Sequence, residues 1–376
     1  MTQKLRIVHC FRSPVGGIFR HVRDLAEAQS AAGHLVGIVC DSTTGGDFEE
    51  RLFDEMRPNL ALGVSRTPMQ RHIGLGDLAA AWRAYRIIKE LQPDVLHGHG
   101  AKGGVYSRVF GSVLRVFRFR VARLYTAHGG SLHYDERTAT GKLFFALERL
   151  MARFTDYILF VSEYERSAFH RKVGKPERPS GLVYNGLSEA EFEKVAAAQG
   201  AADFLYIGMM RDLKGPDLFI DALALLEVSC GRQASAVMVG GGEHLCRYQA
   251  QVKRLGLEDR VRFLKPMPAR QAFALARVVV VPSRAEAMPY IVLEALAAGK
   301  AMIATAVGGI PEIFGADSPA IVRPDAAEIA GKMAEALCDP AAFAAIMPDA
   351  ANLRSRFGTD AMSAEIEKAY LTALRR

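Results

Sequence analysis

The sequence has little of what marks secreted, metal-bound or membrane-spanning chains. Its five cysteines are scattered over 376 residues, and none of them forms a C-x-x-C pair. An odd number of separated cysteines favours reduced thiols over a disulfide framework, and it indicates the cytosol. No apolar run is long and uncharged enough to cross a bilayer. The first ten residues lack the long apolar region of a signal peptide and read as a strand.

Length, composition and charge set the broad class of the protein. A chain of 376 residues is too long for one ordinary domain, so we expect two. An apolar fraction of 50% is enough for two cores and excludes a disordered chain. The net charge of +7 permits attraction to anionic nucleotides or an anionic membrane without requiring either. No recognised nucleic-acid motif accompanies the basic residues, so we expect no nucleic-acid partner.

Strand-like and helix-like segments alternate along the chain. Residues 5–10 and 35–40 read as strands around a helical pattern, which is the β-α-β order of a doubly wound parallel sheet. The alternation restarts at residue 203, after a charged, alanine-rich stretch without strand signal. We therefore predict an N-terminal domain over 1–186, a linker over 187–200 and a C-terminal domain over 201–357. The terminal helix has one apolar stripe, formed by Met362, Ile366, Ala369, Tyr370 and Ala373.

The most informative stretch runs from Arg284 to Gly299. It follows the apolar strand Val278–Val281, and Pro289 suits the first turn of the short helix that it predicts. Glu286 would lie in the loop at the carboxyl end of the strand, and Glu294 inside the helix. Because open α/β sheets bind ligands at the carboxyl ends of their strands, Glu286 could hold sugar hydroxyls and Glu294 ribose hydroxyls.

Two other strand ends carry residues suited to chemistry. Arg211 and Lys214 stand between the predicted strand at 203–208 and a helix that begins near Asp217. Two fixed cations and a helix N-terminus match the charge that develops on a departing diphosphate. His128 follows the strand at 121–126 and lies next to two glycines, a position suited to active-site work.

Histidines and glycines at other strand ends leave alternatives open. His97 and His99 could ligate a metal, but no carboxylate or cysteine accompanies them, and no D-x-D motif occurs in a metal-binding context. We expect them to line a cleft between the domains, or His97 to fill a polar core position. Gly16-Gly17 lets a ligand approach the backbone, but the third glycine of a dinucleotide fingerprint is absent.

Two helical segments carry an apolar or basic signature. The helix predicted over Gly76–Leu91 has residues at core spacing, namely Leu78, Ala81, Trp82, Tyr85, Ile88 and Leu91. Residues 108–123 contain five arginines interleaved with aromatic and aliphatic residues. This segment suits either an anionic membrane surface or a solvated helix face followed by a strand.

The downstream stretch carries a family resemblance. Glu286 and Glu294, with seven residues between them, resemble the paired-glutamate motif of retaining glycosyltransferases of family 4. The likeness continues through Ala297-Ala-Gly-Lys300 and Gly308-Gly-Ile-Pro-Glu312 and covers nearly the whole chain. It implies an α/β GT-B architecture, in which two Rossmann-like domains face each other across a cleft. A C-terminal helix, here 358–376, then packs back on the first domain.

The resemblance also implies roles for individual residues. Arg211 and Lys214 would stabilise the leaving diphosphate, Glu286 would hold the donor sugar, and His128 would contact that sugar. Further donor-binding positions implied are Gly16, Gly17, Gly208, Gly241, Lys265, Met288, Pro289, Tyr290 and Glu294. Acceptor-side positions implied are His97, His99, Lys102 and Asn185. Lys265 stands where many members of the family have glycine, which weakens the expected preference for uridine over guanosine or adenosine.

The activity implied is transfer of a sugar from a nucleotide-sugar, with retention at the anomeric carbon and without cofactor or essential metal. The acceptor would be a hydroxyl of a glycan or a lipid-linked sugar in bacterial cell-surface polysaccharide synthesis, for example of lipopolysaccharide. Such an enzyme works in the cytosol or as a peripheral protein on the inner membrane face. Two alternatives stay open: a sugar-nucleotide epimerase of the same fold, and a non-catalytic nucleotide-sugar-binding protein.

Overall fold

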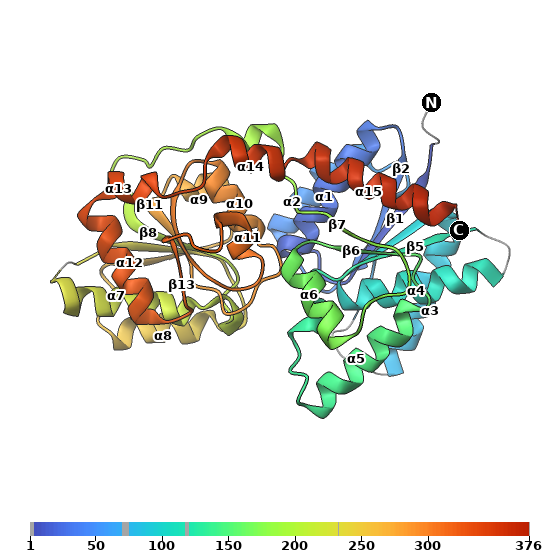
Figure 1. Cartoon of the computed structure of the whole chain (residues 1–376), viewed down its shortest axis with the longest axis horizontal. Coiled ribbons are helices and arrows are strands. Elements are labelled where there is room, and N and C mark those ends of the chain that lie inside the picture. Colours follow the sequence, from blue (N-terminus) through green and yellow to red (C-terminus); the bar gives the residue numbers. More distant parts are fainter. Residues whose placement is uncertain (1–3, 70–74, 117–119, 232, 376) are drawn as a thin grey trace. The chain divides into compact units, whose positions relative to one another are not determined.

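The structure is a computed structural model that describes residues 4–69, 75–116, 120–231 and 233–375. The chain divides into two compact units. Unit 1 comprises Met1–Gly186 and Thr359–Arg376, and unit 2 comprises Leu187–Gly358. Each unit contains one parallel sheet with helices against it (Figure 1).

Unit 1 is built on a seven-stranded sheet in the order β3-β2-β1-β4-β5-β6-β7, and all its strand pairs are parallel. The strands are β1 Arg6–Phe11, β2 Leu35–Asp41, β3 Gly63–Thr67, β4 Val95–His99, β5 Ala122–Thr126, β6 Tyr157–Phe160 and β7 Ser180–Leu182. The helices are α1 Gly16–Ala31, α2 Asp47–Met56, α3 Leu75–Leu91, α4 Gly100–Val116, α5 Ala139–Ala152, α6 Glu163–Lys172 and α15 Thr359–Leu374, with short 3-10 turns η1 Arg57–Asn59 and η2 Gly130–His133.

Unit 2 is built on a six-stranded parallel sheet in the order β10-β9-β8-β11-β12-β13. The strands are β8 Ala202–Ile207, β9 Ala236–Val239, β10 Val261–Leu264, β11 Ala276–Val281, β12 Ala301–Thr305 and β13 Ile321–Val322. The helices are α7 Pro216–Cys230, α8 Leu245–Arg254, α9 Ala269–Phe273, α10 Tyr290–Ala297, α11 Ile310–Phe314, α12 Ala326–Cys338, α13 Pro340–Ala345 and α14 Ala350–Arg356, with turns η3 Glu189–Phe192 and η4 Asp212–Lys214.

Both sheets reverse their strand order once. In unit 1 the order turns between β1 and β4, and in unit 2 it turns between β8 and β11. At such a switch point the two following loops diverge to opposite faces of the sheet, which leaves a crevice at the carboxyl ends of the strands. The predicted fold class, two doubly wound α/β sheets, is confirmed.

The last helix completes unit 1. The predicted apolar stripe of α15 is fully buried. It packs on Leu5, on Ile7 of β1 and on Leu124 of β5. Residues 187–200, predicted as a linker, instead pack within unit 2. They contain η3, and Val195 N donates to Ala298 O at 2.9 Å. The chain therefore crosses from unit 1 to unit 2 at Gly186–Leu187, and residues 187–200 belong to unit 2.

The predicted core face of α3 is partly wrong. Leu78 and Trp82 are 73% and 61% exposed. The helix is buried instead through Ala80, Ala84 and Ile88. Leu78 and Trp82 stand two residues from this stripe, which is about 200° around a helix, so they lie on the opposite face.

Three arginines of the basic segment at 108–123 pair with buried carboxylates instead of forming the predicted basic surface. Arg108 is fully buried, pairs with Glu148 at 2.8 Å and lies 4.0 Å over the Tyr125 ring. Arg115 and Arg123 both pair with Asp156, at 2.6 and 2.8 Å. These arginines tie α4 and β5 to neighbouring elements, because each meets a buried carboxylate. Residues 117–119 of this segment lie outside the described residues. Within the described part of the chain, no helix is long and apolar enough to span a membrane.

Candidate active site

Two loops meet at the switch point of unit 2. One connects β8 to α7 and carries Arg211 and Lys214, and the other connects β11 to α10 and carries Glu286. Gly215 caps η4 with φ +67°, and a Cβ there would lie 2.0 Å from the Pro282 carbonyl oxygen. Only glycine fits both this left-handed backbone and this close approach. The glycine therefore lets the two loops pack directly on each other.

Lys214 and Glu286 form the central ion pair of this site. Lys214 Nζ lies 2.6 Å from Glu286 Oε1 and 2.8 Å from Oε2. The Ser283 hydroxyl donates to Oε1 at 2.6 Å. The Glu286 side chain is 8% exposed and that of Lys214 is 25% exposed. The carboxylate is thus fixed in place, while the ammonium remains in reach of a ligand.

Side chains of α8 and of the β11–α10 loop hold the loop that carries Arg211 and Lys214. The Asp212 carboxylate accepts hydrogen bonds from Tyr248 and Arg247, each at 2.6 Å, and these bonds lower the pKa of Asp212. Arg284 donates to the Asp212 carbonyl at 2.7 Å. Among the described residues, Arg211 is in no ion pair. Its charge and that of Lys214 therefore stand together at the start of a helix, which is a suitable place for an anion.

The other predicted donor-binding positions of unit 2 lie at the same edge of its sheet. Gly208, Gly241 and Lys265 follow β8, β9 and β10. Pro289 is the N-cap residue of α10 rather than part of its first turn. Met288, Pro289 and Tyr290 are buried at this N-terminus, and Glu294 is half-buried one turn further along.

Gly308 fixes the loop of Glu286 from the other side. It has φ +61°, and a Cβ there would lie 1.9 Å from the Glu286 carbonyl oxygen. The glycine pair at 308–309 therefore positions the carboxylate through backbone contact.

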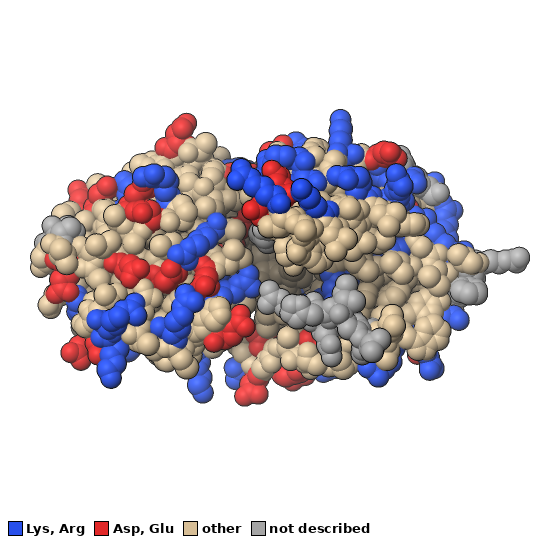
Figure 2. Space-filling model, turned by 90° about the horizontal axis from the view of Figure 1, so that it is seen from below, with Lys and Arg blue, Asp and Glu red and all other residues tan. Residues whose placement is uncertain are grey.

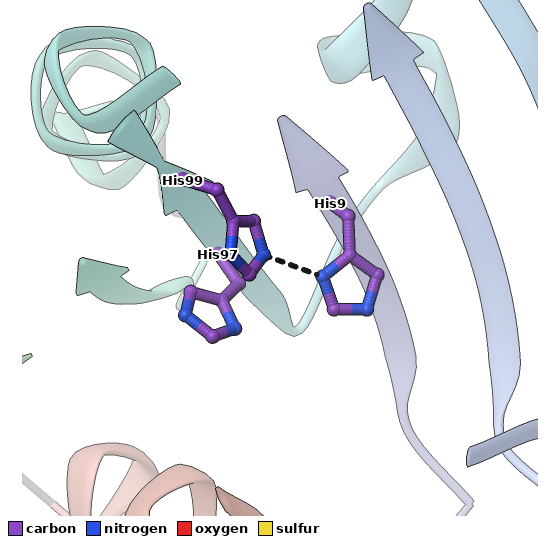
Figure 3. A group of neighbouring side chains, drawn as sticks. All are labelled: His9, His97 and His99. Atoms are coloured by element: carbon purple, nitrogen blue, oxygen red, sulfur yellow. Dashed lines mark hydrogen bonds between the residues drawn. The ribbon is translucent and has the colours of Figure 1, made fainter. Parts of the chain in front are cut away.

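Unit 1 has a cluster of histidines at its own switch point. His9 on β1 lies opposite His97 on β4 in the strand register, and His99 is two residues further along (Figure 3). His21 of α1 and His128 after β5 complete the group; their ring centroids are 4.8 Å apart.

Burial keeps these histidines neutral. Desolvation lowers the pKa of His9 and of His21 to about 4. It also lowers the pKa values of His97, His99 and His128 well below 6.5. A neutral imidazole has one donor and one acceptor nitrogen, so each hydrogen bond fixes which nitrogen carries the proton.

Gln29 sets the direction of a hydrogen-bond chain through the cluster. Its amide nitrogen donates to the Tyr370 hydroxyl at 3.1 Å, and its carbonyl oxygen accepts from His9 Nε2 at 2.8 Å. His9 therefore accepts at Nδ1 from His99 Nε2, 3.0 Å away (Figure 3). His99 in turn accepts at Nδ1 from His128 Nε2 at 3.1 Å.

The other arm of the chain ends at Thr126. The Tyr370 hydroxyl, whose lone pair is taken by Gln29, donates to His97 Nδ1 at 2.8 Å. His97 Nε2 then donates to the Thr126 hydroxyl at 2.8 Å. All four histidines of the chain consequently carry their proton on Nε2. Helix α15 thereby fixes the ring orientation of residues at the carboxyl edge of the sheet.

Two histidine triads have the proximity of metal ligands: His9 with His97 and His99, and His21 with His99 and His128. The ligand atoms of each triad lie within 4.8 Å of one another. In the first triad, however, all six ring nitrogens already have hydrogen-bond partners. A metal ion would have to break this chain, so the residues fit hydrogen bonding better than metal binding.

The predicted residues of unit 1 differ in their accessibility. His97 and Asn185 are buried, and Asn185 Oδ1 lies 3.1 Å from His21 Nδ1. The position of His97 fits the polar core alternative. Lys102 is half-buried in α4, whereas Gly16 and Gly17 are exposed at the start of α1.

His128 is partly exposed and adopts φ +50°, an uncommon backbone for a non-glycine residue. It is thus the accessible end of the hydrogen-bond chain. Sequence reasoning missed its buried members His9, His21 and Gln29. The signal available for His9 was a single polar residue within the apolar run Ile7–Phe11.

Comparison with known protein families accounts for most of the chain. Residues 15–191 match the model described as Glycosyltransferase Family 4, and residues 188–361 match the model described as Glycosyl transferases group 1. The two matches meet at the boundary between the units and cover every predicted site residue, while His9 and Tyr370 of the histidine cluster lie outside them.

Curated relatives match only part of their own length. The chain is 31% identical over 179 residues to D-inositol 3-phosphate glycosyltransferase of Corynebacterium aurimucosum, which is 45% of this chain and 42% of that protein. It is 26% identical over 250 residues to N-acetyl-alpha-D-glucosaminyl L-malate synthase of Bacillus anthracis, 63% of each chain.

A solved structure matches the whole fold. Anabaena HepE, crystallised in complex with UDP and glucose, superposes with a TM-score of 0.80 at 19% identity and covers 97% of this chain and 98% of its own. The two sheets, the paired glutamates in their loop and helix, and the two consecutive family matches therefore lead to one conclusion: the chain belongs to glycosyltransferase family 4.

Proposed function

We propose that the protein transfers a sugar from a nucleotide-sugar, a UDP-sugar, to a hydroxyl group with retention at the anomeric carbon. The observation that carries this proposal is the pair Lys214–Glu286 at the switch point of unit 2, with Arg211 beside it. A protein of the same fold has been crystallised with UDP and glucose, which supports uridine as the base.

Each residue of the donor site receives a role in this proposal. Arg211 and Lys214 neutralise the charge that develops on the diphosphate as the glycosidic bond breaks. Glu294 holds the ribose, and Glu286 holds the donor sugar. Lys214 donates two bonds to Glu286 from an ammonium with three N–H groups, which leaves one for a phosphate oxygen of the donor.

A retaining double displacement uses two carboxylates on opposite sides of the bond, one of them as the nucleophile. Glu286 is held by the Lys214 ammonium and the Ser283 hydroxyl, which suits a role in binding the donor sugar. We therefore propose the same-face route, in which the leaving phosphate oxygen takes the proton of the acceptor hydroxyl as the new bond forms.

The acceptor that we propose is a glycan or lipid-linked sugar of bacterial cell-surface polysaccharide synthesis. His128 is the residue of unit 1 proposed to contact the transferred sugar. Its Nε2 proton is donated to His99, so its Nδ1 is left as a hydrogen-bond acceptor.

Calorimetric titration with UDP, GDP, ADP and NAD, without added metal, tests the donor half of the proposal. We expect micromolar binding of UDP and loss of that binding in Glu294→Ala. Lys253→Ala, an exposed lysine of α8 in the same unit, is the matched control and keeps wild-type affinity. Binding of NAD alone, or UDP affinity unchanged in Glu294→Ala, would refute the assignment of this site.

A further inference from the structure

The outer face of α5 in unit 1 carries an exposed apolar stripe. Leu143, Leu147, Leu150 and Phe154 are 68%, 37%, 46% and 41% exposed. Their spacing of four, three and four residues places them in one line along the helix and the residues that follow it. A surface helix of a globular protein normally presents polar residues on this side.

The inner face of α5 is already satisfied by the core. Phe145 and Met151 are buried, and Glu148 pairs with the buried Arg108. The outer stripe is therefore a second apolar face, which the fold of unit 1 does not use.

A row of cations runs beside the apolar stripe. Lys142, Arg149 and Arg153 are exposed, and each precedes a member of the stripe by one residue. No exposed carboxylate occurs between residues 139 and 154; Asp135 and Glu136 come before the helix begins. Figure 2 shows broad uncharged areas on the half of the molecule that unit 1 forms, with basic side chains near them.

The neighbouring helix extends this surface. The Arg108–Glu148 pair joins α4 to α5, and α4 exposes its own line of Val109, Val113 and Val116, at 38%, 37% and 78%. Both helices that this ion pair joins therefore carry an exposed apolar line.

We propose that this surface, the outer stripe and cation row of α5 with the valine line of α4, docks on an anionic lipid bilayer. An apolar ridge can enter the acyl boundary while the adjacent row of cations stays level with the headgroup phosphates. A planar anionic surface is the partner that matches a straight ridge with charges of one sign along it. The arginines at 108, 115 and 123 are not the lipid contact, because buried carboxylates already hold them.

This inference rests on the proposed function only in giving the enzyme access to a lipid-linked acceptor. Vesicle binding is measured without turnover, and donor binding is measured without vesicles. Failure of one therefore leaves the other standing.

The test is co-sedimentation of the full chain with vesicles of phosphatidylcholine mixed with phosphatidylglycerol, and with vesicles of phosphatidylcholine alone. We expect binding to the mixed vesicles that falls with added salt, since surface charges are screened. Lys142→Gln with Arg153→Gln should weaken the partition coefficient about fivefold for each cation removed. Leu143→Glu with Leu150→Glu should weaken it about tenfold or more for each leucine.

Two control variants change unit 2 in the same way. Val228→Glu places a carboxylate at a residue of α7 that is 85% exposed, and Lys253→Gln with Arg254→Gln removes two exposed cations of α8. Both should bind the mixed vesicles like the wild type. The proposal would be overturned if the control variants weakened vesicle binding as much as the α5 variants do. It would also be overturned if the wild type were a dimer, and Leu143→Glu with Leu150→Glu separated the dimer without changing vesicle binding.

Discussion

Mild acid should unfold unit 1 selectively, because its buried histidines must stay neutral. The pKa of His9 and of His21 is lowered to about 4 in the folded state, whereas an unfolded histidine titrates near 6.5. Above pH 6.5 neither state binds these protons, and the full stabilisation is present. As the pH falls from 6.5 toward 4, the unfolded state takes up protons that the folded state refuses, and the free energy of unfolding decreases.

The size of the effect follows from the pKa difference. At pH 5 each of these two histidines lowers the free energy of unfolding by about 2 kcal/mol relative to neutral pH, so the pair lowers it by about 4 kcal/mol. That is a large part of the roughly 5–15 kcal/mol that stabilises a typical domain. His97, His99 and His128 act in the same direction. The pKa values of Asp41 and Asp156 are also lowered. Their contribution to the free energy of unfolding is lost only below about pH 4, so it does not change between pH 6.5 and 5.

Hydrogen exchange followed by mass spectrometry can read the two units separately. We expect peptides from β4 to lose protection between pH 7 and 5, after correction for the intrinsic exchange rate, while peptides from β8 keep theirs. Unit 2 is the internal control, since it contains one histidine, His244, on its surface. His9→Gln should flatten the pH dependence of unit 1, and His244→Gln should not. Unchanged protection of β4 down to pH 5, or equal loss in both units, would refute the reasoning.

Three further predictions test single contacts, and a fourth tests for a required metal ion. Lys214→Ala should lower kcat by roughly two to three powers of ten, because it removes one preorganised charge partner of the leaving group; wild-type turnover in steady-state assays would exclude that role. Tyr370→Phe should lower the free energy of unfolding by about 1–3 kcal/mol, since it leaves buried partners unsatisfied, and urea titration measures the change. Activity should survive EDTA, and loss that added divalent metal restores would show a required ion. Gly308→Ala should weaken binding of a UDP-sugar in the calorimeter, because its Cβ would strike the carbonyl oxygen of Glu286, which holds the sugar; unchanged affinity would refute this role of the contact.

The sequence predicted what depends on local order along the chain. The alternation of strands and helices, the buried stripe of α15 and the positions of Glu286 and Lys214 at strand ends all follow from residues close in sequence. The direct bond between Lys214 and Glu286 could not be predicted, because 72 residues separate them. It arises only when β8 and β11 become neighbours in the sheet.

The wrong predictions for the exposed face of α3 and for Arg108 also arise from contacts between elements far apart in the sequence. The spacing of Leu78 and Trp82 is compatible with burial, but the face that α3 buries is selected by the smaller Ala80 and Ala84. Arg108 looked like a surface charge because its partner Glu148 lies 40 residues away. Pairing between distant elements decided both cases, and a single chain gives no local sign of it.

The discontinuity of unit 1 has a consequence for synthesis of the protein. Translation delivers residues 1–186 first, yet the core formed by Leu5, Ile7 and Leu124 stays uncovered until α15 has been made. All of unit 2 is translated in between, so the unit begun first is the one finished last. Tyr370, which joins the two arms of the histidine chain, arrives with that final helix. In a nascent or truncated chain that lacks α15, the first unit therefore exposes apolar surface that chaperones and proteases can recognise. The hydrogen-bond chain of the histidines can become ordered only after α15 has been synthesised.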